Sequence, residues 1–551
     1  MRRPLLELAG ALVVFLLTIA VAWPSLQFGF VDDDHAVVLE RKPFWEMGLS
    51  DFLHSRPYAT GRHFLAVTLD LDRLPSGTVP LPFHATNIAI AGLLSVLVLV
   101  LALRLGLSAA AASVAAALFA VHPVHVDAVS SIVGRCEALA AIGVVGALLV
   151  ALGPADPARR RAGPWLILVA TALLAGIAMH SNESALCLPL LLVSARLLLG
   201  ARVALAPALA GTAVAIASWA AIVVPLMPTM APTDFVDNPL VHMPATERIP
   251  KACAILWDYA RLLVWPHPLL EDRSFRMTDP SLASGTIAVA AWLLVAWMVW
   301  RLARRHRVAA FAIAWFPLAF AVTANIAGTI GVMMAERLLL LPSVGVCLLA
   351  GLAFERFAST LRARALATVA TVGVVITLFV LFRARQAPWN DPESYFAISA
   401  ASSPLSAKAQ FDYGTWLLHR GEREDAEASF SRALALVPSF AMANSLKAQS
   451  MAERGDAGGA AESYLAYIAT TPDDTNALKN LASLLMQAGR PREALHWARR
   501  LVELLPGDQG AVDVLEAAEG EAKQADANDK PKVAPEAAPP KADAATPSLN
   551  P

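Results

Sequence analysis

The chain has 551 residues, of which 57% are hydrophobic and only 16% are charged. This composition is typical of a polytopic membrane protein and argues against a soluble globular one. The formal net charge of −1 gives no electrostatic indication of nucleic-acid binding. The four cysteines lie in or beside apolar runs without CxxC spacing, so they predict neither a zinc site nor a disulfide framework.

The N-terminal segment begins Met-Arg-Arg and continues as an apolar run from Leu5 to Trp23. No convincing small-x-small cleavage site precedes Pro24, so we interpret the run as an uncleaved first helix. A helix crosses a bilayer with about 20 mostly apolar residues. Eleven stretches are candidates for such spans: 5–23, 84–104, 108–121, 137–153, 164–180, 184–199, 203–224, 284–302, 308–326, 336–354 and 364–382.

The basic residues orient these spans. If Arg2 and Arg3 are cytoplasmic, alternation places every basic cluster between spans on the cytoplasmic side, as the positive-inside rule requires. This orientation holds only if the short apolar segment 251–265 lies at the interface or re-enters without crossing. We therefore expect an integral protein of a bacterial inner or plasma membrane, with the residues after 383 outside. The loops expected on the exterior side are 24–83, 122–136, 180–183, 225–283 and 325–337.

The exterior side collects the unusual polar clusters, beginning with an acidic run directly after the first span. Asp32, Asp33 and Asp34 are followed there by the imidazole of His35. A solvated acidic turn is one interpretation of such a run. Because the other polar clusters share this side, the run is also a candidate active site.

Further polar residues on this side suggest binding of an anionic ligand. Arg56 and Arg62 could bind a phosphate bidentately, although a solvated loop with ion pairs would contain the same residues. The HxxH pattern at 122–125 could ligate a metal, but Pro123 works against the helical geometry that would align the imidazoles. We favour a polar lining of a membrane-embedded cavity, with paired charges at helix ends as the alternative. The remaining candidates are His84, His122, His125, Arg135, Glu137, Glu183, Glu336 and Arg337.

Together these residues offer carboxylates, cations and an apolar helical wall on one side of a membrane. A carboxylate can accept the proton of a hydroxyl that attacks an anomeric carbon. Cations can stabilise a departing lipid phosphate. The combination favours glycosyl transfer from a lipid-linked phosphosugar.

A 34-residue period begins after about residue 406. Glycine, alanine and proline each recur in one register, at 421, 455 and 489, at 426, 460 and 494, and at 438, 472 and 506. Small residues where two helices pack, glycine at the turn and proline at the end of each unit predict tetratricopeptide repeats. The Ala/Pro/Lys-rich segment 521–551 has almost no large apolar residues and is expected to be disordered.

Two stretches carry a family resemblance: HPVHVDAVSSIVGRCE at 122–137 and AERLLLLPSVG at 335–345. With the acidic run and the repeats, the chain resembles the transmembrane and tetratricopeptide-repeat protein O-mannosyltransferase family and its bacterial relatives. The resemblance implies a GT-C fold and an inverting transfer from a polyprenyl-phosphate sugar. It also implies a catalytic or acceptor-binding role for Asp33 and Asp34. Three positions depart from the family pattern: Asp32 stands at a usual aromatic, Asn182 at a usual lysine and Leu340 at a usual tyrosine.

The sequence thus predicts an all-α protein with a GT-C-like membrane domain of about eleven spans, followed by a tetratricopeptide-repeat solenoid. The expected divisions are 1–382 for the membrane domain, 383–405 for a linker and 406–508 for three repeats. The predicted function is transfer of mannose or another hexose to a protein hydroxyl, with the repeats binding the acceptor or a partner. The alternative is a non-catalytic membrane scaffold. No metal ligands are predicted, a divalent cation is left open, and the base remains unassigned among the three aspartates.

Overall fold

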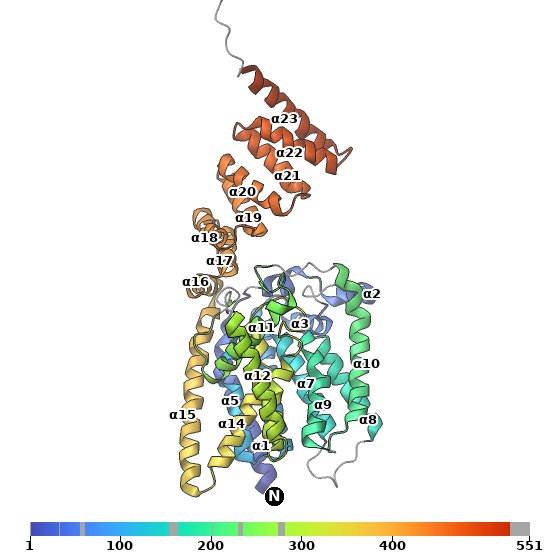
Figure 1. Cartoon of the computed structure of the whole chain (residues 1–551), viewed down its shortest axis with the longest axis vertical. Helices are drawn as coiled ribbons and strands as arrows, with labels where there is room; N and C mark the ends of the chain where they lie inside the picture. Colours follow the sequence, from blue (N-terminus) through green and yellow to red (C-terminus); the bar gives the residue numbers. More distant parts are fainter. Residues whose placement is uncertain are drawn as a thin grey trace, which may run out of the picture. The chain divides into compact units, whose positions relative to one another are not determined.

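The computed structural model describes residues 2–31, 33–55, 61–153, 163–200, 202–229, 235–270, 272–273 and 282–528. Every regular element in these residues is helical, which confirms the predicted all-α class. The chain divides into two compact units, Met1–Trp416 and Leu417–Pro551 (Figure 1). The sequence-based boundaries at 382 and 406 stay predictions.

The N-terminal unit consists of α-helices joined by short 3₁₀ or π turns. Its α-helices are α1 (Arg2–Ala22), α2 (Leu49–His54), α3 (His63–Ser76), α4 (Pro80–Leu105), α5 (Ala109–Ala120), α6 (Val126–Ser130), α7 (Arg135–Leu152), α8 (Pro164–Met179), α9 (Leu188–Leu199), α10 (Leu205–Val223), α11 (Ala245–Val264), α12 (Leu282–Leu302), α13 (Arg307–Ala319), α14 (Ser343–Phe357), α15 (Leu361–Gln386) and α16 (Pro392–Ser402). The turns used below are η2 (His35–Glu40), η5 (Pro123–His125), η7 (Glu183–Cys187) and η9 (Glu336–Leu339). Helix α17 (Ala407–His419) contains the boundary between the units.

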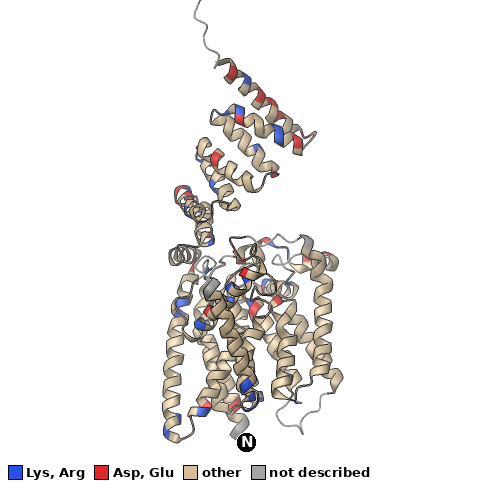
Figure 2. Ribbon diagram, in the orientation of Figure 1, with Lys and Arg blue, Asp and Glu red and all other residues tan. Residues whose placement is uncertain are grey.

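Each of the eleven candidate spans contains or overlaps a helix. Among the described residues, six helical segments are long and apolar enough to cross a membrane, or seven if the bent pair 109–120 and 123–130 is one span. The protein is therefore an integral membrane protein, and the count of eleven stays a prediction. Figure 2 shows the charged residues of this unit concentrated toward the helix ends, with long uncharged stretches between them.

The apolar segment at 251–265 forms the C-terminal part of α11 and the residue that follows it, Trp265. The charged residues Asp258 and Arg261 distinguish this helix from the candidate spans. Its buried residues Ile255, Leu256, Tyr259 and Leu262 recur at helical spacing on one side. This pattern fits the expectation that the segment lies at the interface.

The core of the N-terminal unit forms where α4, α5 and α7 pack with α1, α8 and α14. Close approach depends on small residues. A side chain at Gly143 would collide with the backbone of α8 at Leu174, and one at Gly211 would collide with α8 at Leu168. Such contacts let helices pack in a membrane without an apolar driving force between them.

Helix α15 differs from this core because most of its apolar side chains are exposed. Leu366 and Val369 are each 71% exposed, and Ile376 and Val380 are similarly open. In an integral membrane protein this surface faces lipid.

The C-terminal unit is a stack of antiparallel helices, in which neighbours along the chain pack together. Gly421, Gly455 and Gly489 each adopt positive φ in the turn between helices, where a residue without Cβ is favoured. Ala448, Ala460, Ala482 and Ala494 are fully buried between helices. The helices are α18 (Arg423–Leu436), α19 (Ala441–Glu453), α20 (Ala457–Thr470), α21 (Thr475–Gln487), α22 (Pro491–Leu504) and α23 (Gln509–Asn528).

The expected disorder from residue 521 differs from the structure, because α23 continues to Asn528. Ala511, Ala518 and Ala522 are buried on the side that packs on α22. Small side chains at helical spacing suffice for this packing although the segment has few large apolar residues. Residues 529–551 lie outside the described residues.

Candidate functional site

A cavity of 600 Å³ opens in the N-terminal unit, and we call it the main cavity. Each of the five loops expected on the exterior side contributes to it or to an adjoining recess of 80 Å³, as do residues after 383. The charged and amide residues that line the main cavity are Asp33, Arg41, Arg62, Glu137, Asn182, Glu183, Asp237, Arg337 and Lys408. The segments that alternation placed on one side of the membrane therefore meet at one site.

The two aspartates of the acidic run have different surroundings. Asp33 is exposed and lines both the main cavity and the recess. Asp34 is 1% exposed, and its carboxylate accepts hydrogen bonds from the backbone amides of Val31 at 3.3 Å and Val133 at 3.0 Å. A neighbouring amide, that of Ile132, donates to it at 3.4 Å. Asp34 thus anchors the 131–133 turn, and Asp33 is the carboxylate that faces the cavity.

Arg62 and Glu183 form a bidentate ion pair on the cavity wall. The guanidinium donates from Nη2 to Oε1 at 2.9 Å and from Nε to Oε2 at 3.3 Å. Burial acts to raise the pKa of Glu183, but the charge and hydrogen bonds of Arg62 outweigh it and hold that pKa below its usual value. Glu183 is therefore a carboxylate near neutral pH.

Glu137 lies at the start of α7 and is nearly buried. Its Oε1 accepts a hydrogen bond from Nδ2 of Asn182 at 2.9 Å, and both residues line the main cavity. The Asn182 side chain also accepts from the backbone of Ser184 at 2.8 Å, which fixes its orientation at the start of η7. The pair presents a carboxyl and an amide to the cavity in a defined arrangement.

Cations reach the cavity from two further segments. Arg337, on η9, donates to Asp127 at 3.4 Å and lines the cavity and the recess. Lys408, on α17, pairs with Asp237 at 2.6 Å. The lining thus contains four cationic side chains, with Arg41 and Arg62, and four acidic ones, Asp33, Glu137, Glu183 and Asp237, so it offers guanidinium donors within a mixed-charge surface.

Arg135 is fully buried and does not line the main cavity. It donates to Asp72, to Asn87 Oδ1 at 2.6 Å, and to the carbonyls of Thr68 at 3.1 Å and Phe83 at 2.9 Å. These contacts tie α7 to α3 and α4. The guanidinium of Arg135 therefore has a structural role in joining these helices.

The three predicted histidines also lie outside the lining of the main cavity. His84 is buried in α4 with its ring edge-on to Phe28. The Nε2 atom of His122 donates to the carbonyl of Leu263 at 3.1 Å, while Nε2 of His125 pairs with Ser343 Oγ at 3.0 Å. These contacts join the HxxH segment to α11 and α14 separately and give Nε2 of each imidazole a different protein partner.

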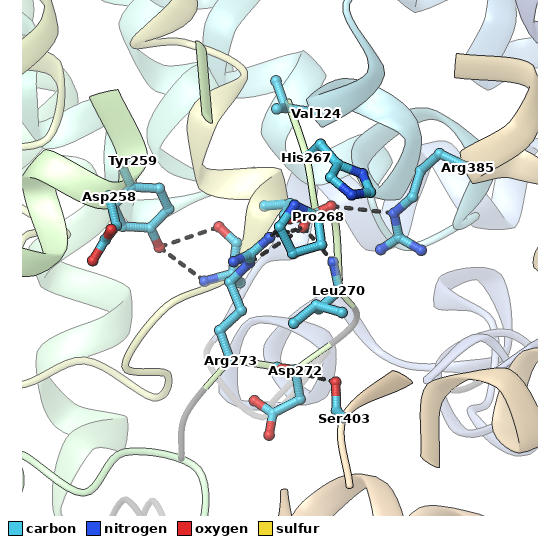
Figure 3. A network of polar contacts seen from close by, with 12 residues as sticks. Val124, Asp258, Tyr259, His267, Pro268, Leu270, Asp272, Arg273, Arg385 and Ser403 are labelled. Carbon is cyan, nitrogen blue, oxygen red and sulfur yellow. Dashed lines mark hydrogen bonds and ion pairs between the residues drawn. The ribbon is translucent and has the colours of Figure 1, made fainter. Parts of the chain in front are cut away.

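Glu336 is the centre of a buried polar network. Figure 3 shows this network from close by, with its members Leu270, Arg273 and Arg385 labelled. It accepts from the backbone amide of Leu270 at 2.7 Å, from Arg273 at 3.1 Å and from Arg385 at 3.3 Å. The hydroxyl of Tyr259 holds the preceding residue, Ala335, by accepting from its amide at 2.8 Å. Glu336 is thus turned into the scaffold, whereas the next residue lines the cavity.

Two predicted residues cannot be placed, because Arg56 and Asp32 lie outside the described residues. Within the described residues, no group of three or more His, Cys, Asp or Glu side chains is arranged to hold a metal ion.

Three charged cavity residues were absent from the predicted site: Arg41, Asp237 and Lys408. Asp237 lies in the loop 225–283, which was expected on the exterior side, so a signal for it existed. No local pattern singles out the other two residues. Arg41 pairs with the fully buried Asp70, and Lys408 lies beyond the last span.

The comparisons with known proteins agree with the resemblance drawn from the motifs. The tetratricopeptide repeat family matches residues 416–475 and 445–509. Protein O-mannosyl-transferase F38B6.6 from Caenorhabditis elegans is 25% identical over 407 residues, covering 72% of this chain and 56% of that protein. Protein O-mannosyl-transferase TMTC3 from Homo sapiens is 24% identical over 471 residues, covering 75% and 49%.

The chain spans about half the length of the curated relatives it matches. Among solved structures it is similar to ArnT from Cupriavidus metallidurans, bound to undecaprenyl phosphate, at 14% identity and a TM-score of 0.35. That likeness covers 92% of this chain and 81% of the other. The resemblance to the O-mannosyltransferase family is confirmed by the sequence relatives and the repeats.

Proposed function

We propose that this protein is an inverting membrane glycosyltransferase that moves a hexose from a polyprenyl-phosphate donor to a protein hydroxyl on the exterior side. The observation that supports this most directly is that Asp33, Arg62 and Arg337 all line the main cavity. The similarity to protein O-mannosyl-transferases supports mannose as the first sugar to test.

The proposed base is Asp33. It would accept the proton of the acceptor hydroxyl as that oxygen bonds to the anomeric carbon. The bond between the anomeric carbon and the phosphate oxygen breaks on the opposite face, and its electron pair leaves with the lipid phosphate. Asp34 takes no part in this step, because its carboxylate is buried against backbone amides.

The cations would stabilise the phosphate as its charge grows. Arg62 and Arg337 come from the first loop and from η9, so a phosphate between them would be contacted by two guanidiniums. Both are already oriented by carboxylates, Glu183 and Asp127 respectively, which reduces the reorganisation needed when the donor binds.

The pair of Glu137 and Asn182 would bind the sugar. Carboxylates and amides hydrogen-bond sugar hydroxyls, and here the two side chains are already joined at 2.9 Å. The repeats would bind the protein acceptor or a partner, since stacked helix pairs present an extended surface to a polypeptide.

The test is transfer of radiolabelled sugar from a panel of polyprenyl-phosphate donors to protein acceptors in proteoliposomes, with wild type compared with Asp33→Asn. We expect activity to fall about 10²- to 10⁴-fold, the range for loss of a general base, without a change in thermal unfolding. Asp51→Asn is the matched control, because it removes the same charge from an exposed residue of α2. No activity with any donor would favour the non-catalytic scaffold, and equal activity in wild type and Asp33→Asn would remove Asp33 as the base.

A further inference from the structure

A second cavity of 410 Å³ lies in the N-terminal unit beside the exposed helix α15. Its wall is formed by the loop 266–270, by Leu381, Ala384 and Arg385, and by Ile398 and Ser402 of α16. None of its lining residues lines the main cavity or the recess. The described residues therefore form two separate chambers.

The rim of this second cavity is apolar and open. Val264 is 77% exposed and Trp265 66%, and both directly precede the loop that forms the wall. Val380 and Ile398, on the other side, are 59% and 47% exposed. In an integral membrane protein such a rim faces lipid, and an exposed tryptophan favours the level of the lipid headgroups.

The inner wall, by contrast, carries positive charge. The side chain of Arg385 is only 10% exposed, and its guanidinium is held by Glu336, which also pairs with Arg273. Figure 3 shows both arginines at this network. Two guanidiniums therefore share one carboxylate, and this group of three residues has a formal net charge of +1. His267 lies on the same wall.

We propose that the second cavity binds an anionic phospholipid of the bilayer, with its phosphate on Arg385 and its acyl chains along α15. A guanidinium suits a phosphate oxygen by charge and by its planar donor geometry. Basic pockets between membrane helices bind anionic headgroups in this way. The occupant is a resident lipid and not the reacting donor, because Asp33 and Arg62 belong to the other cavity.

The structure around Arg385 supports this separation. Residues 335 and 337 line the recess beside the main cavity, while residue 336 between them holds Arg385. Helix α16 is divided in the same manner, with Ser399 toward the recess and Ser402 toward the second cavity. These two segments form a wall between the chambers.

The experiment is native mass spectrometry of the full-length protein released from vesicles of phosphatidylglycerol and phosphatidylcholine, with no sugar donor present. We expect a phosphatidylglycerol adduct in wild type and its reduction by at least about tenfold in Arg385→Gln, since one charge-assisted contact is lost. Arg383→Gln is the matched control, because it removes the same charge from an exposed residue of the same helix that lines neither cavity. This control should keep the adduct.

Because Arg385→Gln also removes a partner of Glu336, a second variant, Ala384→Trp, fills the cavity and keeps the ion pair. It too should lose the adduct. Adducts that persist in both variants would overturn the proposal, as would equal loss in Arg383→Gln. In a parallel titration, displacement of phosphatidylglycerol by undecaprenyl phosphate that persists in Arg62→Gln would assign the second cavity to the donor lipid and overturn the proposal as well. Lipid binding is measured without turnover, so its failure is distinct from failure of the proposed transferase activity.

Discussion

Charged side chains of the same kinds line the main cavity and lie buried in the packed helices around it. In the first group they face an open cavity, and in the second they are held by hydrogen bonds and ion pairs. Each of three sequence motifs contributes residues to both groups. Asp33 faces the cavity while Asp34 holds backbone amides, and Arg337 faces it while Glu336 is buried in an ion network. Glu137 lines the cavity two residues after the buried Arg135. Successive residues of a turn or helix point to different sides, so a motif marks a site without giving its members one role.

The largest stability effect should come from Arg135→Gln. The variant leaves Asp72 without its buried guanidinium partner and removes the hydrogen bonds that join α7 to α3 and α4. Breaking a buried ion pair costs about 3–5 kcal/mol, and thermal unfolding in detergent should show it. The double variant Arg135→Gln, Asp72→Asn should recover part of the loss, because no unpaired charge then remains. An unfolding temperature of Arg135→Gln equal to that of wild type would show that Arg135 does not stabilise the scaffold.

Arg337→Gln should reduce activity and leave stability nearly unchanged. Its side chain is 32% exposed at the cavity, so stability should change little, whereas transfer should fall about 10²- to 10³-fold if it stabilises the departing phosphate. The measurement is kcat for transfer together with thermal unfolding of the same preparation. Arg261→Gln, a 44% exposed arginine that lines none of the three cavities, is the control and should retain activity. Loss of stability in parallel with activity would show that Arg337 belongs to the scaffold.

Asp34→Asn tests the division within the acidic run. An asparagine places an NH₂ group among the amide donors of Val31, Ile132 and Val133, so the charged acceptor and part of the hydrogen bonding are lost. Hydrogen bonds to a charged group contribute about 1.5–3 kcal/mol, and we expect a destabilisation of that order. Asp33→Asn should unfold like wild type. Equal unfolding temperatures for the two variants would remove the structural distinction between these residues.

Much of the fold followed from patterns that repeat along the chain. The apolar stretches predicted helices, and the 34-residue register predicted the stacked pairs with Gly421, Gly455 and Gly489 at their turns. The alternation of the basic clusters predicted that five loops lie on the exterior side of the membrane. These loops meet at the main cavity and its recess. These inferences depend on composition and period, which the local sequence contains.

The partners of individual charges did not follow from the sequence, because they depend on contacts between distant segments. Glu336 and Arg385 are 49 residues apart, and Arg62 and Glu183 are 121 apart. Nothing in the spacing distinguishes a guanidinium saturated by the scaffold, such as Arg135, from one on a cavity wall. The missed Lys408 has the same explanation, since its partner Asp237 lies 171 residues away.

The smallest expected effect is a pH dependence of stability from His63 and His180, whose ring centroids are 6.4 Å apart. In the sequence His63 directly follows Arg62, and His180 precedes Glu183 by three residues. Burial lowers the pKa of both, and the Gly61 carbonyl only partly opposes this at His63. The folded protein therefore binds fewer protons than the unfolded chain once the pH falls below about 6.5, the unfolded value, and stability decreases as acidification continues toward the folded pKa values. Thermal unfolding between pH 8 and pH 5 should show this slope, and His63→Gln should flatten it whatever its stability at pH 8. His306→Gln, at an exposed position, should leave the slope unchanged. A wild-type slope that His63→Gln does not reduce would mean that other titratable groups, such as the buried His122 and His125 or the carboxylates of the cavity, govern the response to acid.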